Sequence, residues 1–483
     1  MSLGKQSKRV CASFESLEGR RLFASAIGDV LKDINPGLAS SIGTPGPGSS
    51  VELGGLTYFT ADDGQHGAEL WRTNGTAAGT QLVADLLPRP ESSRPRSLIV
   101  HEGKLAFVAD WANPNNYPQK KTKIWISDGT VEGTTALVDQ SNSWTPESPY
   151  DDITETAGEP ALVPFDGKLL FLAAAPHDPY DSNVGRTYLW QTDGTSETTQ
   201  RYYNYSAAAG STMSMLTVAG DRAYVRVHND NGTYTLARYD LSDIFQTPQT
   251  YNTLPIHEMV AADDKLYLRT SSELPYQSEL FSIDEYGFFA PAAASNFKAY
   301  DLVVVNDQLL ISGAIDYGSV EAFRGLYHPS SDYGVDLIDG QSWPDNPLEN
   351  LTAVGDMLYY SQTRDGPGEY VTRYDTITGQ FTPLSWTNPI PWYPPAFDNI
   401  TDATPGAATF VKGPDGYVYF QAKTNGNFGL FRANNGTQNI ETIQDTPYGS
   451  VGNVLPPASF MTVGGEWYAP GLTWQYGREW HLA

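Results

Sequence analysis

The chain is patterned as short apolar runs joined by tight polar turns. In residues 69–80 (ELWRTNGTAAGT) an apolar run meets an Asn-Gly turn, and residues 123–134 (KIWISDGTVEGT) and 188–195 (YLWQTDGT) repeat the phrase with Asp-Gly. An Asn-Gly or Asp-Gly pair between apolar runs is a signal for a β-hairpin, because the turn needs residues that tolerate positive φ. The pattern therefore predicts strands, and its recurrence predicts stacked or radial units.

A second phrase, an apolar run ending in Gly or Asp and followed by another apolar run, occurs nine times at an average spacing of about 51 residues. The nine copies are residues 51–61, 97–110, 161–174, 215–227, 259–270, 302–313, 350–362, 409–421 and 459–471. Together the two phrases make four strands per unit. The pattern predicts an all-β fold, a β-propeller of about nine four-stranded units. Units four to seven lack the Asp-Gly-Thr turn, so eight blades remain an alternative.

The last unit has three strands and then the chain stops. Residues 28–41 (GDVLKDINPGLASS) resemble residues 80–93 (TQLVADLLPRPESS), which hold the fourth strand of the first unit. We therefore predict that this N-terminal strand completes the last blade and closes the ring, which would remove open sheet edges. Residues 26–483 are predicted to form this single propeller domain, and residues 1–25 a leader that is disordered or cleaved.

Each third strand carries a periodic aromatic residue with apolar neighbours. These residues are Trp71, Trp125, Trp190, Phe281 and Phe431. A platform for sugar rings is one interpretation, because aromatic faces stack on sugars. The regular spacing favours packing between neighbouring blades instead.

Composition narrows the classes of partner. The chain has 483 residues, 45 of them Gly and 33 Pro, and a net charge of −26. The electrostatic field of such a negative protein repels phosphate backbones, so we do not expect a nucleic acid as a partner. The single cysteine, Cys11, cannot form an intrachain disulfide. No apolar run approaches the ~18 residues of a transmembrane helix, and we expect a monomer.

The N-terminal segment differs from the rest of the chain, because residues 1–23 carry five basic and two acidic residues. Residues 13–25 (SFESLEGRRLFAS) resemble the LEPR-XLL leader of large bacterial repeat proteins, with Gly19 in place of the Pro. The resemblance implies export to an extracellular, periplasmic or cell-envelope location.

The repeated turns are candidate metal sites, because carboxylates and turn carbonyls suit calcium. The residues concerned are Asn74, Gly75, Asp128, Gly129, Asp193 and Gly194. None of the turns has the late Glu of a calcium loop, so a structural role is favoured, with Asp or Asn accepting backbone N–H bonds. No cofactor is predicted, and calcium is the alternative.

The repeats themselves resemble the bacterial ELWxxDGT family, and the place of the turn is similar to the Asp-box of sialidase-type propellers. The match is close in the first three units, at Leu70-Trp71, Ile124-Trp125 and Leu189-Trp190 with their turns. The resemblance implies an exported propeller and brings no established chemistry with it.

Catalytic motifs are missing from the sequence: there is no G-x-S-x-G, no H-x-x-x-H, no C-x-x-C and no phosphate-binding loop. Nucleophilic, zinc and nucleotide chemistry are therefore not indicated, and no catalytic residue is predicted. A glycosidase needs only two facing carboxylates, and 56 acidic residues leave that class open.

The remaining signal lies in two long aromatic loops, residues 140–160 and 384–406. Long loops are often functional, and exposed aromatics suit a glycan or a protein surface. The candidate ligand-binding residues are Trp144, Tyr150, Trp386, Trp392 and Tyr393. The alternative is that these loops bury their own aromatics.

These observations predict an exported, non-enzymatic binding or structural propeller that recognises a glycan or an extracellular protein. The alternative is a carbohydrate-active propeller, a glycoside hydrolase or lyase, with paired carboxylates at the channel mouth.

Overall fold

The computed structural model is all-β. It describes residues 34–35, 50–87, 91–112, 120–137, 153, 161–174, 186–202, 210–271, 279–294, 296–315, 323–330, 334–341, 348–363, 369–386, 410–412, 416–424, 427–434, 439–445, 461–463, 466–473 and 477–482. The described strands form nine separate sheets. Seven of them contain four antiparallel strands in chain order, the eighth contains four such strands and one added parallel strand, and the ninth contains three.

The first three sheets comprise β1 (Ser50–Leu53), β2 (Leu56–Asp62), β3 (Ala68–Thr73) and β4 (Gln81–Ala84); β5 (Arg96–His101), β6 (Lys104–Ala112), β7 (Lys120–Ser127) and β8 (Thr135–Ala136); and β9 (Val163–Phe165), β10 (Lys168–Ala174), β11 (Thr187–Thr192) and β12 (Gln200–Arg201). The fourth to sixth comprise β13 (Thr212–Ala219), β14 (Arg222–His228), β15 (Tyr234–Asp240) and β16 (Gln249–Thr253); β17 (Ile256–Ala262), β18 (Lys265–Thr270), β19 (Leu280–Ile283) and β20 (Phe289–Pro291); and β21 (Phe297–Val305), β22 (Gln308–Ile315), β23 (Phe323–Pro329) and β24 (Val335–Gln341).

The seventh sheet holds β25 (Glu349–Val354), β26 (Met357–Thr363), β27 (Glu369–Asp375) and β28 (Gln380–Pro383). The eighth holds β30 (Phe410–Lys412), β31 (Tyr417–Thr424), β32 (Asn427–Asn434) and β33 (Asn439–Asp445), with β29 (Ser385–Trp386) added in parallel to β33. The ninth holds β34 (Met461–Val463), β35 (Glu466–Thr473) and β36 (Gly477–Leu482).

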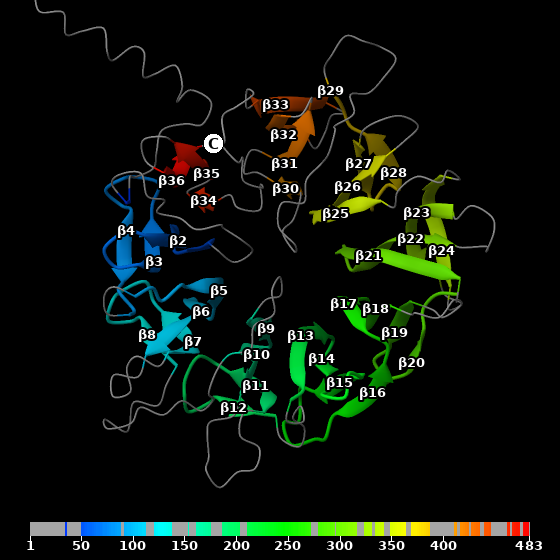
Figure 1. Cartoon of the computed structure of the whole chain (residues 1–483), viewed down its shortest axis with the longest axis horizontal. Helices are drawn as coiled ribbons and strands as arrows, with labels where there is room; N and C mark the ends of the chain where they lie inside the picture. Colours follow the sequence, from blue (N-terminus) through cyan, green and yellow to red (C-terminus); the bar gives the residue numbers. More distant parts are fainter. Residues whose placement is uncertain are drawn as a thin grey trace, which may run out of the picture.

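The sheets are arranged radially, as in a β-propeller (Figure 1). The first strand of each sheet lies nearest the centre and the last strand nearest the outside. This agrees with the predicted class of fold. Units four to seven form four-stranded sheets even though they lack the Asp-Gly-Thr turn.

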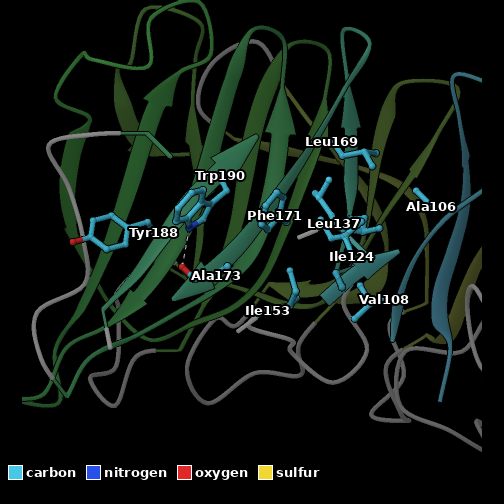
Figure 2. Packing of buried hydrophobic residues seen from close by; sticks show 12 residues of the cluster. Ala106, Val108, Ile124, Leu137, Ile153, Leu169, Phe171, Ala173, Tyr188 and Trp190 are labelled. Atoms are coloured by element: carbon cyan, nitrogen blue, oxygen red, sulfur yellow. Dashed lines mark hydrogen bonds between the residues drawn. The ribbon is translucent and has the colours of Figure 1, made fainter. Parts of the chain in front are cut away.

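The hydrophobic core lies between neighbouring sheets, because the faces of adjacent sheets pack against each other. One cluster joins Val108 and Ile124 of the second sheet to Phe171 and Trp190 of the third (Figure 2). The periodic aromatics Trp71, Trp125, Trp190 and Phe431 are buried, and Phe281 packs against a similar cluster. The interpretation as packing between blades is confirmed.

Several innermost strands contain a β-bulge near their N-terminal end. The register shifts between Ser214 and Thr217 in β13, between Ile256 and Glu258 in β17, and between Ala299 and Asp301 in β21. A bulge adds a residue to one strand and re-aims the side chains beside it. Polar side chains are therefore redirected at the same level of neighbouring inner strands.

The predicted N-terminal closing strand lies almost wholly outside the described residues. Ile34 is described, and it is buried in one cluster with Phe59 and Trp71 of the first sheet and Met461 and Val463 of the ninth. Thr57 Oγ1 donates to the Thr462 carbonyl at 2.6 Å across the same boundary. In the described part of the chain, no helix has the length and apolar character that a membrane crossing requires.

Candidate functional site

Most of the aromatic residues that were expected to bind a ligand lie outside the residues that the structure describes. Trp144, Tyr150, Trp392 and Tyr393 lie outside the described residues, and the side chain of Trp386, in β29, is not described either. From the loop of residues 140–160 only Ile153 is described. It is buried between the second and third sheets, where its N–H donates to the Thr122 carbonyl at 3.2 Å.

The repeated turns are closed by their own side chains. Asp128 Oδ1 accepts from the Thr130 N–H at 2.9 Å and from Thr130 Oγ1 at 2.7 Å, and Asn74 makes the same pair of bonds with Thr76. Asp193 accepts from Thr198 Oγ1 and from Thr195. The glycines Gly75, Gly129 and Gly194 have φ of +86°, +87° and +99°, which suits glycine.

These bonds change the acidity of the turn carboxyls. Hydrogen bonds from Thr130 lower the pKa of Asp128, and those from Thr198 and Thr195 lower the pKa of Asp193. A carboxyl with a lowered pKa adds stability above its ordinary pKa, and that stability is lost as the pH falls through the lowered value. In the described residues, no group of three or more His, Cys, Asp or Glu is placed to hold a metal ion.

We expect Asp193→Ala to lower the free energy of unfolding by about 0.5–1.5 kcal/mol, the usual net value of an intramolecular hydrogen bond. Asp193→Asn should stay close to wild type, because the amide oxygen of Asn74 makes the equivalent bonds in the first sheet. Equilibrium urea unfolding at pH 7 measures both. Equal losses in the two variants would show that the charge, and not the acceptor, stabilises the turn.

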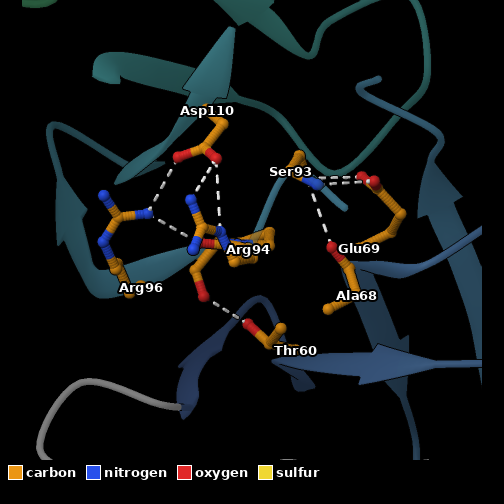
Figure 3. A network of polar contacts seen from close by, with 8 residues as sticks. Thr60, Ala68, Glu69, Ser93, Arg94, Arg96 and Asp110 are labelled. Carbon is orange, nitrogen blue, oxygen red and sulfur yellow. Dashed lines mark hydrogen bonds and ion pairs between the residues drawn. The ribbon is translucent and has the colours of Figure 1, made fainter. Parts of the chain in front are cut away.

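A second polar network anchors the connection between the first and second sheets (Figure 3). Glu69, fully buried in β3, accepts from the Leu86 N–H at 3.0 Å, the Ser93 N–H at 2.9 Å and Ser93 Oγ at 2.5 Å. Burial raises the pKa of Glu69 to about 7, although these bonds act in the opposite direction. Next to it, Asp110 accepts from Arg94 Nη2 at 2.5 Å. All of Glu69's partners belong to the connecting segment, so this network is architectural.

The remaining titratable cluster lies on the first and second strands of the fourth to sixth sheets. We call it the inner-strand cluster, and it consists of Arg226, His257, Glu258, Arg269 and Asp301. Arg269 Nε donates to Glu258 Oε2 at 2.9 Å, and both side chains are about one quarter exposed, at 25% and 22%. Arg226 donates to Ser214 Oγ at 3.0 Å and to the Ile256 carbonyl at 2.7 Å.

The electrostatics of the inner-strand cluster are unusual for a surface ion pair. Burial raises the pKa of Glu258 to about 7, and the charge of Asp301 raises it further, while Arg269 and the Leu302 N–H act against the rise. Burial and the charges of Arg269 and Arg226 lower the pKa of His257, so its ring is neutral at pH 7. The cluster therefore holds a carboxyl that exchanges its proton near neutrality beside a second carboxylate.

Sequence reasoning missed this cluster because its members are far apart in the chain and match no motif. Glu258 and Asp301 come from the first strands of neighbouring sheets, and Arg269 comes from β18. The bulges in β17 and β21 come immediately before Glu258 and Asp301, which are the first paired residues after them. The one available signal was the repeat alignment, in which each acid comes directly before the apolar run of its strand.

No family model and no curated protein matches the chain. Among solved structures it resembles a puromycin hydrolase, at 15% identity over 80% of this chain and 59% of the hydrolase, with a TM-score of 0.38. It also resembles prolyl oligopeptidase B from Galerina marginata, at 11% identity over 82% and 56%, with a TM-score of 0.40. The β-propeller domain of the Trilobed protease from Pyrococcus furiosus matches at 12% identity over 74% and 96%, with a TM-score of 0.35.

The solved structures that resemble the chain belong to hydrolases and peptidases, which does not agree with the predicted non-enzymatic binding module, although at 11–15% identity the likeness itself shows the fold alone. The alternative prediction was a carbohydrate-active enzyme, and carbohydrates are a different class of substrate from those of the hydrolases and peptidases. The chain spans a little over half the length of the whole enzymes, 59% of the puromycin hydrolase and 56% of the oligopeptidase.

Proposed function

We propose that this chain is the propeller part of a peptide-hydrolysing enzyme, and that the inner-strand cluster holds the amino terminus of the substrate peptide. The observation that carries the proposal is the pair of acids Glu258 and Asp301 on neighbouring inner strands, with a single guanidinium, Arg269, bonded to Glu258. In this proposal the cluster positions the peptide, and bond cleavage is left to other groups of the enzyme.

The two acids are the groups of the cluster that could hold a cation. The charge of Asp301 repels a negative charge on Glu258 and, after burial, is the second cause of its raised pKa, while Arg269 acts against the rise. An α-ammonium group placed between the two carboxyls would offset that repulsion and form charge-assisted hydrogen bonds. The net charge of −26 also favours the approach of a cationic peptide end.

The pH dependence of peptide binding is set by the Glu258 carboxyl and by the α-amino group of the peptide. Glu258 must lose its proton to hold an ammonium, and this happens as the pH rises through about 7. A peptide α-amino group loses its charge near pH ~8. We therefore expect binding to strengthen from pH 6 to about pH 7.5 and to weaken above about pH 8.

Calorimetry with a C-terminally amidated tetrapeptide tests the proposal. We expect the peptide with a free amino terminus to bind ~10-fold or more tightly than its N-acetylated form, and Glu258→Gln to weaken binding by a similar factor and flatten the pH dependence. The matched control is Glu441→Gln, which breaks the outer-strand pair with Arg432 (Nη2 to Oε2, 2.8 Å). Equal binding of the free and acetylated peptides would refute the proposal.

We also propose that the nine sheets close into a ring, with the segment of residues 28–41 completing the ninth. The burial of Ile34 with Met461 and Val463 supports this closure. Deletion of residues 1–41 should then destabilise the ninth sheet, which hydrogen exchange of residues 461–482 would detect.

A further inference from the structure

A cavity of about 310 Å³ opens between the fourth and fifth sheets, away from the inner-strand cluster. It lies where strand β15 and its turn into β16 meet the β19–β20 turn of the next sheet. Its walls include Arg222, Arg238, Asp240, Gln249, Glu285 and Tyr286. The volume is at the lower end of the range typical of small-ligand pockets.

Arg238 is the central cation of this cavity, and neutral groups hold it in place. Its Nη1 donates to Gln249 Oε1 at 2.8 Å and its Nη2 to the Glu285 carbonyl at 2.7 Å. No carboxylate among the described residues forms an ion pair with it. A half-buried guanidinium satisfied by neutral acceptors keeps its full charge available for a carboxylate, which it can bind in a bidentate manner.

The acids in the cavity wall do not serve as that partner. Asp240 Oδ1 accepts from the Ser242 N–H at 3.0 Å and from Ser242 Oγ at 2.6 Å, and Oδ2 lies 3.3 Å from Arg222 Nη2. Glu285 meets Arg238 through its backbone carbonyl, and its carboxylate lies beside the Tyr286 hydroxyl. Arg222 also pairs with Asp221. Of the two guanidinium groups, Arg222 forms ion pairs and Arg238 forms none with the described residues, although the charge of Arg238 also helps to lower the pKa of Asp240.

The arrangement around Arg238 is held rigidly by Gly287. This glycine has φ of +87°, and a Cβ there would lie 2.7 Å from Gln249 Oε1 and 3.3 Å from Arg238 Nη1. The Gly287 carbonyl also accepts from the Tyr251 hydroxyl at 2.9 Å. The positive φ favours glycine here, and a side chain at this position would displace Gln249 Oε1, which accepts a bond from Arg238.

Large apolar side chains are exposed on the same two turns. Phe245, next to the lining residue Gln246, is 65% exposed, and Tyr286 and Phe288 are 83% and 60% exposed. Three exposed aromatics on two adjacent turns are an unusual concentration for a protein surface, and such groups mark binding sites. They supply an apolar surface beside the fixed cation.

Arg72 occupies the equivalent place in the first sheet, and its surroundings show that an arginine alone does not make a binding site. Arg72 Nη1 donates to the Gly129 carbonyl of the next sheet at 2.9 Å, as Arg238 does to Glu285. The turn that it reaches carries Val131 as its exposed apolar residue and no aromatic side chain. Arg72 therefore links two sheets and serves as an internal control for Arg238.

We propose that the cavity at Arg238 binds the free C-terminal carboxylate of a peptide or protein whose last residue is apolar. The carboxylate pairs with the Arg238 guanidinium, and the apolar side chain packs on Tyr286 and its aromatic neighbours. This site is separate from the inner-strand cluster, because none of its lining residues belongs to that cluster. It lies between the outer parts of two sheets, and it would recognise the opposite end of a peptide.

Fluorescence polarisation with an N-acetylated hexapeptide that ends in phenylalanine, labelled on an internal lysine, tests this site. We expect binding of the free acid, ~10-fold weaker binding of the C-terminal amide, and ~10-fold weaker binding by Arg238→Gln. Tyr286→Ala, at an exposed position that cannot disturb the core, should weaken binding ~3–10-fold. A peptide that ends in an amide but carries an internal glutamate separates a free C-terminus from an acidic side chain, and it should bind like the plain amide.

Two variants provide the controls. Arg72→Gln removes the same kind of inter-sheet bond at another place, and Glu441→Gln breaks the pair with Arg432 in the eighth sheet; both should bind the acetylated peptide as wild type does. Equal affinity for the acid and the amide, or unchanged binding in Tyr286→Ala and a still folded Arg238→Gln, would overturn the proposal. So would an equal loss in Arg72→Gln, because it would reveal general destabilisation.

Discussion

Replacing Trp190 by alanine is expected to lower the free energy of unfolding by about 3–5 kcal/mol. The indole is only 4% exposed, stacks on Phe171 with ring centroids 6.3 Å apart, and donates from Nε1 to the Ala173 carbonyl at 3.0 Å (Figure 2). It belongs to the cluster between the second and third sheets. Alanine would leave a cavity between two sheets that have no disulfide to hold them.

Equilibrium urea unfolding, followed by far-UV circular dichroism, measures this loss. Trp190→Phe should lose less, because the ring remains and only the bond to Ala173 and part of the volume disappear. Phe245→Ala is the matched aromatic control, since its side chain is 65% exposed and should change stability by less than about 0.5 kcal/mol. A small effect of Trp190→Ala, similar to that of the control, would mean that the sheets do not depend on this contact.

Stability is expected to fall as the pH rises from 5 to 8, and Glu69 is expected to contribute about 3 kcal/mol to that fall. Burial raises the pKa of Glu69 from an ordinary value of 4.5 to about 7. A group with a raised pKa binds its proton more tightly in the folded chain. The stability that it adds is complete below pH 4.5 and is lost as the pH rises through about 7.

Urea unfolding at pH 5, 6, 7 and 8 measures this dependence, with Glu69→Gln as the variant that cannot titrate. The stability of the variant should change less with pH, because its amide cannot exchange a proton in this range, whereas the wild-type carboxyl loses its proton as the pH rises through about 7. Glu258 also has a pKa of about 7, so the double variant Glu69→Gln with Glu258→Gln should show a still weaker dependence of stability on pH. An unchanged slope in the double variant would rule out both carboxyls as its source.

The turns show how local chemistry can be preserved while a motif disappears. Sheets four and seven lack Asp-Gly-Thr, but Asp240 and Asp375 follow an Arg-Tyr pair in each and close the turn in the same way. Asp240 accepts from the Ser242 N–H at 3.0 Å, and Asp375 accepts from the Ile377 N–H at 2.9 Å. The short Arg-Tyr-Asp phrase was therefore a readable signal for these units.

The candidate sites were less accessible to sequence reasoning than the turns. The expectation centred on loop aromatics such as Trp144 and Trp392, because long loops with aromatics often bind ligands. The described structure instead brings together Glu258, Arg269 and Asp301, and separately Arg238 and Tyr286. Each group joins residues of neighbouring sheets, and nothing in a single repeat shows which residue of the next one it will face.

The amino-acid sequence by itself determined the all-β class, the repeated four-stranded unit, the turns at Asp128 and Asp193, and the burial of the periodic aromatics. These features depend on contacts within one unit or on an apolar period, and both are visible along the chain. Only the tertiary structure decided that Glu258 lies close enough to Asp301 for its charge to act on it, and that Arg238 lines a cavity without an ion pair to any described carboxylate. The reason is physical: pKa values, cavities and ion pairs depend on distances between separate sheets, and the radial packing of neighbouring sheets sets those distances.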